Sequence, residues 1–184
     1  MAQPSTLYRF RIDLTDIDRG VYKSLDFRVA MHPSESESYL VTRVLAYALN
    51  YQDDLQFSKE GLGNPEDPSI SIADPGGGYK LWIEIGNPSI KRIHKSTKSA
   101  HKVKVYTYKN PELLIEELLT DKIYQPERIE LYHFSDRFLD PLAETLERDN
   151  SWNLIHQEGS LTIQVREDAF EGEVKSISLD RLFK

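Results

Sequence analysis

The chain has 184 residues, no cysteine, 23 Lys and Arg against 30 Asp and Glu, and a net charge of -7. The absence of cysteine excludes disulfide bonds, a zinc ribbon and a thiol nucleophile, and it is typical of a reducing compartment. No apolar stretch is long enough to span a bilayer. We therefore expect a cytoplasmic, monomeric protein without membrane association, folded as a single domain over residues 1–184.

The first part of the chain predicts a β-hairpin followed by a helix. Residues 7–15 alternate between polar and apolar side chains, which is typical of a half-buried strand, and residues 21–30 are suited to pair with it. Ser34 with Glu37 three positions later predicts a capping box, and the apolar spacing that follows predicts a helix reaching about residue 51.

From residue 69 to residue 148 short strands alternate with helices. Strands are expected at 69–73, 79–85, 103–108 and 129–134, a tight turn at 75–78, and helices at 89–100, 110–119 and 136–148. Residues 151–179 predict two or three more strands with a turn at Glu158-Gly159. This order predicts an α/β fold with a mixed sheet, parallel central strands and helices on its faces. The β-hairpin segments at the two ends either extend that sheet or form a second small one.

The charge is unevenly distributed along the chain. Between Ile85 and Pro111 there is no acidic residue, whereas seven basic residues fall in this window: Lys91, Arg92, Lys95, Lys98, Lys102, Lys104 and Lys109. Lysines at helical spacing on the expected helix 89–100 fit phosphate binding, which makes nucleic acid a possible partner. An ordinary solvated helix face is the competing interpretation.

Glu84 is the strongest single candidate for chemistry. It lies within the apolar segment Leu-Trp-Ile-Glu84-Ile, where a buried carboxylate is costly unless it has a partner. Together with Glu66-Asp67-Pro68 at the start of the preceding strand, it supplies oxygen ligands of the kind that Mg²⁺ prefers. The competing interpretation is that Glu84 forms a salt bridge to the basic helix directly after it.

These residues resemble the YaeQ family. The resemblance is carried by His32-Pro-Ser-Glu35, Arg43, Pro65-Glu-Asp67-Pro68, Leu81-Trp-Ile-Glu84-Ile-Gly86 and Lys91-Arg92-Ile-His-Lys95, and it covers nearly the whole chain. It implies a restriction-endonuclease-like core, a variant of the PD-(D/E)xK nuclease fold, with added β-hairpins at both ends. It also implies a metal site, for which Mg²⁺ is the expected cofactor.

Within this resemblance each acidic residue has an expected role. Asp67 would match the Asp of the PD pair, Glu84 the acid of (D/E)xK, and Glu35 the acid that the superfamily often places on its first core helix. Gly86 stands where the usual strand lysine would be, so Lys91 or Lys95 would supply that amine. An acid directly after Pro68 would be usual in the family, and this chain has Ser69 there.

Two functions follow from these observations. The first is a Mg²⁺-dependent nuclease with Glu35, Asp67, Glu84 and Lys95 or Lys91 as catalytic residues, and Asp67 and Glu84 as metal ligands. The second is a non-catalytic module that binds nucleic acid or an acidic protein through Lys91, Arg92, Lys95 and Lys98.

Three other features have ordinary structural interpretations. His32 would pack or cap a turn, Arg43 would form a structural salt bridge, and Pro75-Gly-Gly-Gly78 lacks the strand–loop–helix order of a phosphate-binding loop.

Overall fold

The computed structural model describes residues 4–58 and 66–183. In these ranges the chain forms ten strands and four α-helices. The strands are Thr6–Asp16 (β1), Val21–Met31 (β2), Gln56–Phe57 (β3), Ile70–Ala73 (β4), Tyr79–Ile85 (β5), Ala100–Thr107 (β6), Ile129–Phe134 (β7), Asp149–Gln157 (β8), Ser160–Val165 (β9) and Asp168–Ile177 (β10). The helices are Glu37–Leu49 (α1), Ile90–Ser99 (α2), Pro111–Thr120 (α3) and Asp136–Ala143 (α4), with 3₁₀ turns at Pro126–Arg128 and Asp180–Phe183.

All ten strands belong to one mixed sheet in the order β2-β1-β8-β9-β10-β7-β6-β5-β4-β3. The central strands β5, β6 and β7 are parallel, as predicted, because α2 and α3 connect them. The hairpins at the two ends of the chain extend this sheet rather than forming another. They join through a parallel pairing of β1 with β8, which connects residues 9–16 to residues 149–156.

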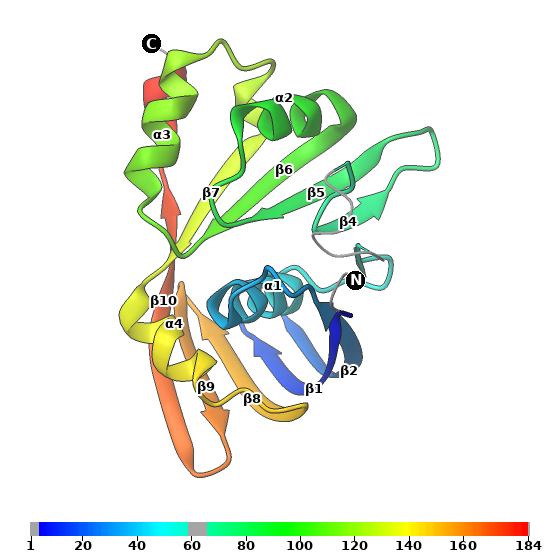
Figure 1. The fold of residues 1–184 in the computed structure, drawn as a ribbon, viewed down its shortest axis with the longest axis vertical. Coiled ribbons are helices and arrows are strands. Elements are labelled where there is room, and N and C mark those ends of the chain that lie inside the picture. The colour runs from blue at the N-terminus through cyan, green and yellow to red at the C-terminus, as the bar shows by residue number, and fades with distance from the viewer. Residues whose placement is uncertain (1–3, 59–65, 184) are drawn as a thin grey trace.

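The sheet bends strongly around α1, so that it is nearly closed and barrel-like (Figure 1). Its two edge strands approach each other. The ring centroid of Phe27 on β2 lies 5.4 Å from that of Phe57 on β3. Tyr47 of α1 contacts both rings. Helix α1 therefore lies inside the curve, and its Leu, Val and Ala side chains are buried. This burial is the main source of stability on the inner side of the sheet.

Helices α2 and α3 cover the outer face of β5, β6 and β7 (Figure 1). Side chains alternate along β5 between two cores: Leu81, Ile83 and Ile85 face α1, whereas Trp82 packs with Ile93 of α2. Because side chains alternate with a period of two, Glu84 lies on the same face as Trp82. The carboxylate of Glu84 is thus placed between the sheet and α2.

Several element boundaries differ from the predictions. Helix α1 begins after Ser36, whose hydroxyl accepts the Tyr39 amide, so the capping box predicted at Ser34 is wrong. Ser34 instead contacts Nδ1 of His32 in the turn before the helix. Helix α4 ends at Ala143 rather than 148. The strand expected at 103–108 begins earlier, at residue 100, and no strand was expected at β3.

Two other expectations are confirmed. Residues 74–78 form a β-turn that joins β4 to β5, with the Gly77 amide donating to the carbonyl of Asp74. The turn at Glu158-Gly159 has both residues at positive φ. In the part of the chain that is described, no helix is both long and apolar enough to cross a membrane.

Candidate functional site

Glu84 is buried between β5 and α2 with two direct partners. The residue is only 2% exposed to solvent. Oε1 accepts a hydrogen bond from the indole Nε1 of Trp82 at 2.5 Å and lies 2.8 Å from Nη2 of Arg92. Trp82 can reach it because residues two apart on a strand share a face. The salt bridge to the basic helix, which the sequence offered as an alternative, is therefore present.

Burial dominates the electrostatics of Glu84. Desolvation raises the pKa of its carboxyl above the ordinary value, although Arg92 and Trp82 act in the opposite direction by stabilising the charged form. A carboxyl whose pKa is raised by burial beside a specific cation is a common property of functional sites, and it also occurs in structural ion pairs.

Arg92 connects Glu84 to the segment that carries the other predicted acid. The same Nη2 atom that lies 2.8 Å from Glu84 Oε1 donates to the main-chain oxygen of Asp67 at 2.8 Å. One turn further along α2, Nζ of Lys95 donates to the main-chain oxygen of Glu66 at 2.8 Å and forms an ion pair with the Glu66 carboxylate. Arg92 and Lys95 thus hold the main chain of residues 66–67 against α2, on the side where Glu84 lies.

Helix α2 can make these contacts because of its spacing and its start. Ser89 caps the helix by accepting from the Arg92 amide, and Ile93 is buried against the sheet. Arg92 and Lys95 are three residues apart and so lie on the same side of the helix. That side faces residues 66–67.

Glu35 lies in a separate, fully buried ion pair. Its Oε2 is 2.9 Å from Nη2 of Arg43, which also donates to the main-chain oxygen of Ala30 at 2.6 Å. Arg43 therefore forms the structural salt bridge that its position within α1 suggested.

Tyr39 lies beside the Glu35–Arg43 pair, with its ring centroid 5.9 Å from Cζ of Arg43. Its hydroxyl is 3.4 Å from the hydroxyl of Ser69. Burial raises the pKa of Tyr39 to about 12, with smaller effects from Arg43, Glu35 and Glu84.

The remaining predicted residues, Lys91 and Lys98, lie on the exposed side of α2. No set of three or more His, Asp or Glu side chains within the described ranges is arranged as a metal site.

Much of the positive charge of segment 85–111 is compensated by neighbouring acids. Besides the Arg92 and Lys95 contacts, His101 is 2.8 Å from Asp74, and Lys102 and Lys104 both approach Glu130. The segment is basic in sequence because its acidic partners come from other strands. The sequence analysis missed this pairing, since no local signal connects residue 130 with residues 102–104.

Comparison with known proteins identifies the relatives of this chain. The family model described as YaeQ protein matches residues 1–174. YaeQ of Escherichia coli (strain K12) is 35% identical over 109 residues, which span 59% of this chain and 59% of that protein. YaeQ of Salmonella typhi is 27% identical over 162 residues, covering 88% of this chain and 89% of that protein.

Two solved structures have the same fold. The crystal structure of YaeQ protein from Pseudomonas syringae matches with a TM-score of 0.86 at 27% identity, covering 96% of this chain and 98% of that one. The YaeQ structure from Xanthomonas axonopodis pv. citri matches with a TM-score of 0.85 at 24% identity, covering 94% and 97%. The family match over residues 1–174 and the shared fold lead to one conclusion: this chain belongs to the YaeQ family.

Proposed function

We propose that this chain is a metal-dependent phosphodiesterase that acts on nucleic acid, with a PD-(D/E)xK-type site at Asp67 and Glu84. The observation that supports the proposal best is the position of Arg92. One guanidinium nitrogen bridges the Glu84 carboxylate and the Asp67 carbonyl oxygen, at 2.8 Å from each. A cation thus already bridges the two residues that would share a metal.

The donors suit Mg²⁺ in their chemistry. Mg²⁺ prefers oxygen ligands and is commonly bound by one or two carboxylates, with water and substrate phosphates completing its coordination. Asp67 and Glu84 supply such oxygens, and Arg92 would have to leave Glu84 for a metal to bind. Glu35 is assigned no metal contact, because Arg43 holds its carboxylate.

The residues around Glu84 would have distinct tasks. Bound Mg²⁺ would polarise the scissile phosphate and lower the pKa of a coordinated water. Lys95, and Lys91 one turn before it, would place ammonium groups beside the phosphate charge. They would replace the usual strand lysine, whose position is occupied by Gly86 in this chain. Trp82 would keep Glu84 oriented through its indole hydrogen bond.

The test is calorimetric titration of Mg²⁺ and Mn²⁺ into the wild type, Glu84→Gln and Arg92→Met, with cleavage of single- and double-stranded nucleic acid measured on the same samples. We expect Arg92→Met to bind metal more tightly than the wild type, because it removes the competing cation. Glu84→Gln should abolish both binding and cleavage. Lys23→Met removes an exposed charge on β2 and serves as the control.

The absence of binding at millimolar metal in both the wild type and a folded Arg92→Met variant would contradict the proposal. In that case Glu84 would be a structural partner of α2.

A second candidate function is nucleic-acid binding without catalysis through α2. It is favoured by Lys91 and Lys98, which are exposed and form no ion pair within the described ranges. Each lysine that contacts a phosphate should contribute about 0.7–0.9 to the slope of log affinity against log salt. Replacing both with Gln should reduce the slope by about twice that amount, measured by fluorescence anisotropy with labelled DNA and RNA. An unchanged slope would exclude this surface.

A further inference from the structure

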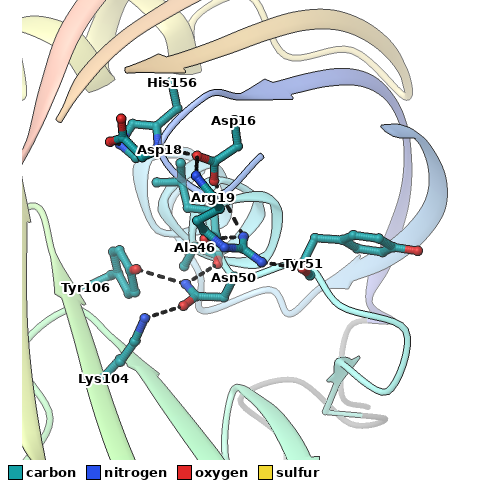
Figure 2. A network of polar contacts seen from close by, with 10 residues as sticks. Asp16, Asp18, Arg19, Ala46, Asn50, Tyr51, Lys104, Tyr106 and His156 are labelled. Atoms are coloured by element: carbon teal, nitrogen blue, oxygen red, sulfur yellow. Dashed lines mark hydrogen bonds and ion pairs between the residues drawn. The ribbon is translucent and has the colours of Figure 1, made fainter. Parts of the chain in front are cut away.

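A polar network lies on the inner side of the bent sheet, away from the Glu84 site on the outer face. Figure 2 shows Arg19 after β1, Asn50 at the end of α1, and Lys104 and Tyr106 on β6 pointing toward one another. Lys104 Nζ donates to Asn50 Oδ1 at 2.7 Å, and Asn50 Nδ2 donates to the Tyr106 hydroxyl at 2.8 Å.

This network forms the wall of a pocket of about 420 Å³. The charged side chains that line it are Arg19, Asp54, Lys80, Lys102 and Lys104, and the amides are Asn50 and Gln52. Four cations and one carboxylate therefore face the same space in a protein whose net charge is -7. Ile72 and Leu81 provide an apolar part of the lining.

The pocket is distinct from the Glu84 site because it lies on the opposite face of the sheet. On β6, Lys104 and Tyr106 point to the α1 side, whereas Val103 and Val105 point to the α2 side, where Trp82 and Glu84 lie. A ligand in the pocket would therefore approach the inner face of the sheet.

The C-terminal end of α1 would normally repel an anion, since its free carbonyl groups carry partial negative charge. Here these groups are satisfied. Arg19 donates to the carbonyl oxygens of Leu49 at 2.8 Å and Tyr51 at 2.6 Å, and Asn50 donates to that of Ala46 at 2.8 Å. Asp16, fully buried and paired with Arg19 and His156, fixes the position of the guanidinium.

The cations of the pocket are close enough to influence one another. Burial lowers the pKa of Lys104, Glu130 opposes this effect, and the charges of Lys102 and Arg19 lower the pKa further. Glu130 is shared between Lys102, at 2.6 Å, and Lys104, at 3.7 Å. One carboxylate thus serves two ammonium groups, and an additional anion would relieve the remaining repulsion.

We propose that this pocket binds the phosphate group of a small ligand of about mononucleotide size. Its volume lies within the range of about 300–1,000 Å³ that is usual for small-molecule sites. Ammonium and guanidinium donors from three separate parts of the chain, residue 19, residue 80 and residues 102–104, converge on it, which suits the several oxygens of a phosphate. The apolar side of Ile72 and Leu81 would contact the non-phosphate part of the ligand.

The test uses pyrophosphate and adenosine monophosphate as probes in calorimetric titrations at low salt. Lys80 and Lys102 are exposed, so Lys80→Gln and Lys102→Gln should fold normally. Each should weaken binding about tenfold, since a hydrogen bond to a charged group contributes on that order. Lys23→Gln makes the same charge change outside the pocket and should leave binding unchanged.

A second measurement locates the ligand directly. The pKa of Lys104, followed by NMR of its side chain, should rise when pyrophosphate binds, because an anion stabilises the ammonium form. No saturable binding at millimolar probe, an equal loss in Lys23→Gln, or an unchanged Lys104 pKa in the bound protein would overturn the proposal.

Discussion

Two carboxylate–arginine pairs among the described residues, Glu35–Arg43 and Glu84–Arg92, differ in their access to water. In Glu35–Arg43, the side chains are 0% and 1% exposed. In Glu84–Arg92, the carboxylate is 3% exposed and the arginine 22%. The first pair is closed on both sides by α1 and the sheet, whereas the second opens to solvent through Arg92 on α2.

This difference separates a structural ion pair from one that can exchange partners. A sealed pair can be broken only by leaving a bare charge in the interior, which is strongly unfavourable. Arg92 can become solvated without unfolding α2, and Glu84 can bind a proton because burial already raises its pKa. The comparison therefore predicts that the two arginines contribute very differently to stability.

The largest effect is expected for Arg43→Met. The change leaves the Glu35 carboxylate buried without its cation and removes a 2.6 Å hydrogen bond to Ala30. Removing one partner of a buried ion pair costs about 3–5 kcal/mol, and we expect a loss of that size in urea unfolding.

The double variant Glu35→Leu/Arg43→Met is the control. It should recover much of the loss, since replacing a buried pair by apolar residues is often close to neutral. Within the described residues, Nε of Arg43 has no hydrogen-bond partner, so the pair itself is incompletely satisfied. A loss below about 1 kcal/mol for Arg43→Met alone would contradict the view of this pair as structural.

A smaller loss is expected for Arg92→Met. The guanidinium is partly solvated, and the Glu84 carboxyl can become protonated and keep its hydrogen bond with Trp82. We expect a loss of about 1–2 kcal/mol, between the values typical of surface and sealed pairs. If urea unfolding gave equal losses for Arg92→Met and Arg43→Met, the distinction between the two pairs would be lost.

The pH dependence of stability sharpens the comparison at Glu84. Its pKa in the folded protein lies above the ordinary value of 4.5, so the folded state binds the proton more tightly than the unfolded state. The stabilisation from this group is complete below the unfolded pKa and is lost as pH rises through the folded pKa. The wild type should therefore lose stability relative to Glu84→Gln from about pH 4 upward.

The measurement is urea unfolding of both proteins at a series of pH values from about 4 to about 8. Carboxyls with lowered pKa, such as Glu66 beside Lys95 and Asp26 beside Arg9, act in the opposite direction but are common to both proteins. If the difference in unfolding free energy between the wild type and Glu84→Gln did not change with pH, Arg92 would fully compensate the cost of burying the Glu84 carboxylate.

The sequence predicted those parts of the fold that local patterns determine. Alternation located β1, an apolar run located β5, and Asn110-Pro111 correctly marked the start of α3, where the Asn110 side chain accepts the Glu112 amide. The start of α1 was misplaced by two residues, because two serines compete for the cap and His32 engages Ser34. The parallel pairing of β1 with β8 has no local pattern that could reveal it.

The candidate site was predictable for the same reason. Glu84 stands out because a carboxylate interrupts an apolar strand, and its partner Arg92 lies on the next helix. The inner pocket was not found from the sequence, because Arg19, Asn50 and Lys104 meet only when the sheet bends around α1. Each of these residues is ordinary in its own segment.

The smallest effect on stability is expected for Lys95→Gln, which tests the exposed end of the Glu84 site. The ion pair of Lys95 with Glu66 is open to solvent on both sides, with side chains 36% and 69% exposed, and pairs of this kind contribute little. The midpoint of urea unfolding should therefore remain at its wild-type value.

Cleavage should nevertheless fall in Lys95→Gln while metal binding is retained, because in the proposed site the ammonium stabilises charge on the phosphate and does not hold the metal. Lys23→Gln makes the same charge change at an exposed position on β2, away from α2, and is the matched control. If Lys95→Gln lowered stability and left cleavage unchanged, Lys95 would belong with Arg43 as a structural cation. Among the cations of the Glu84 site, Arg92 alone would then be able to leave its carboxylate partner.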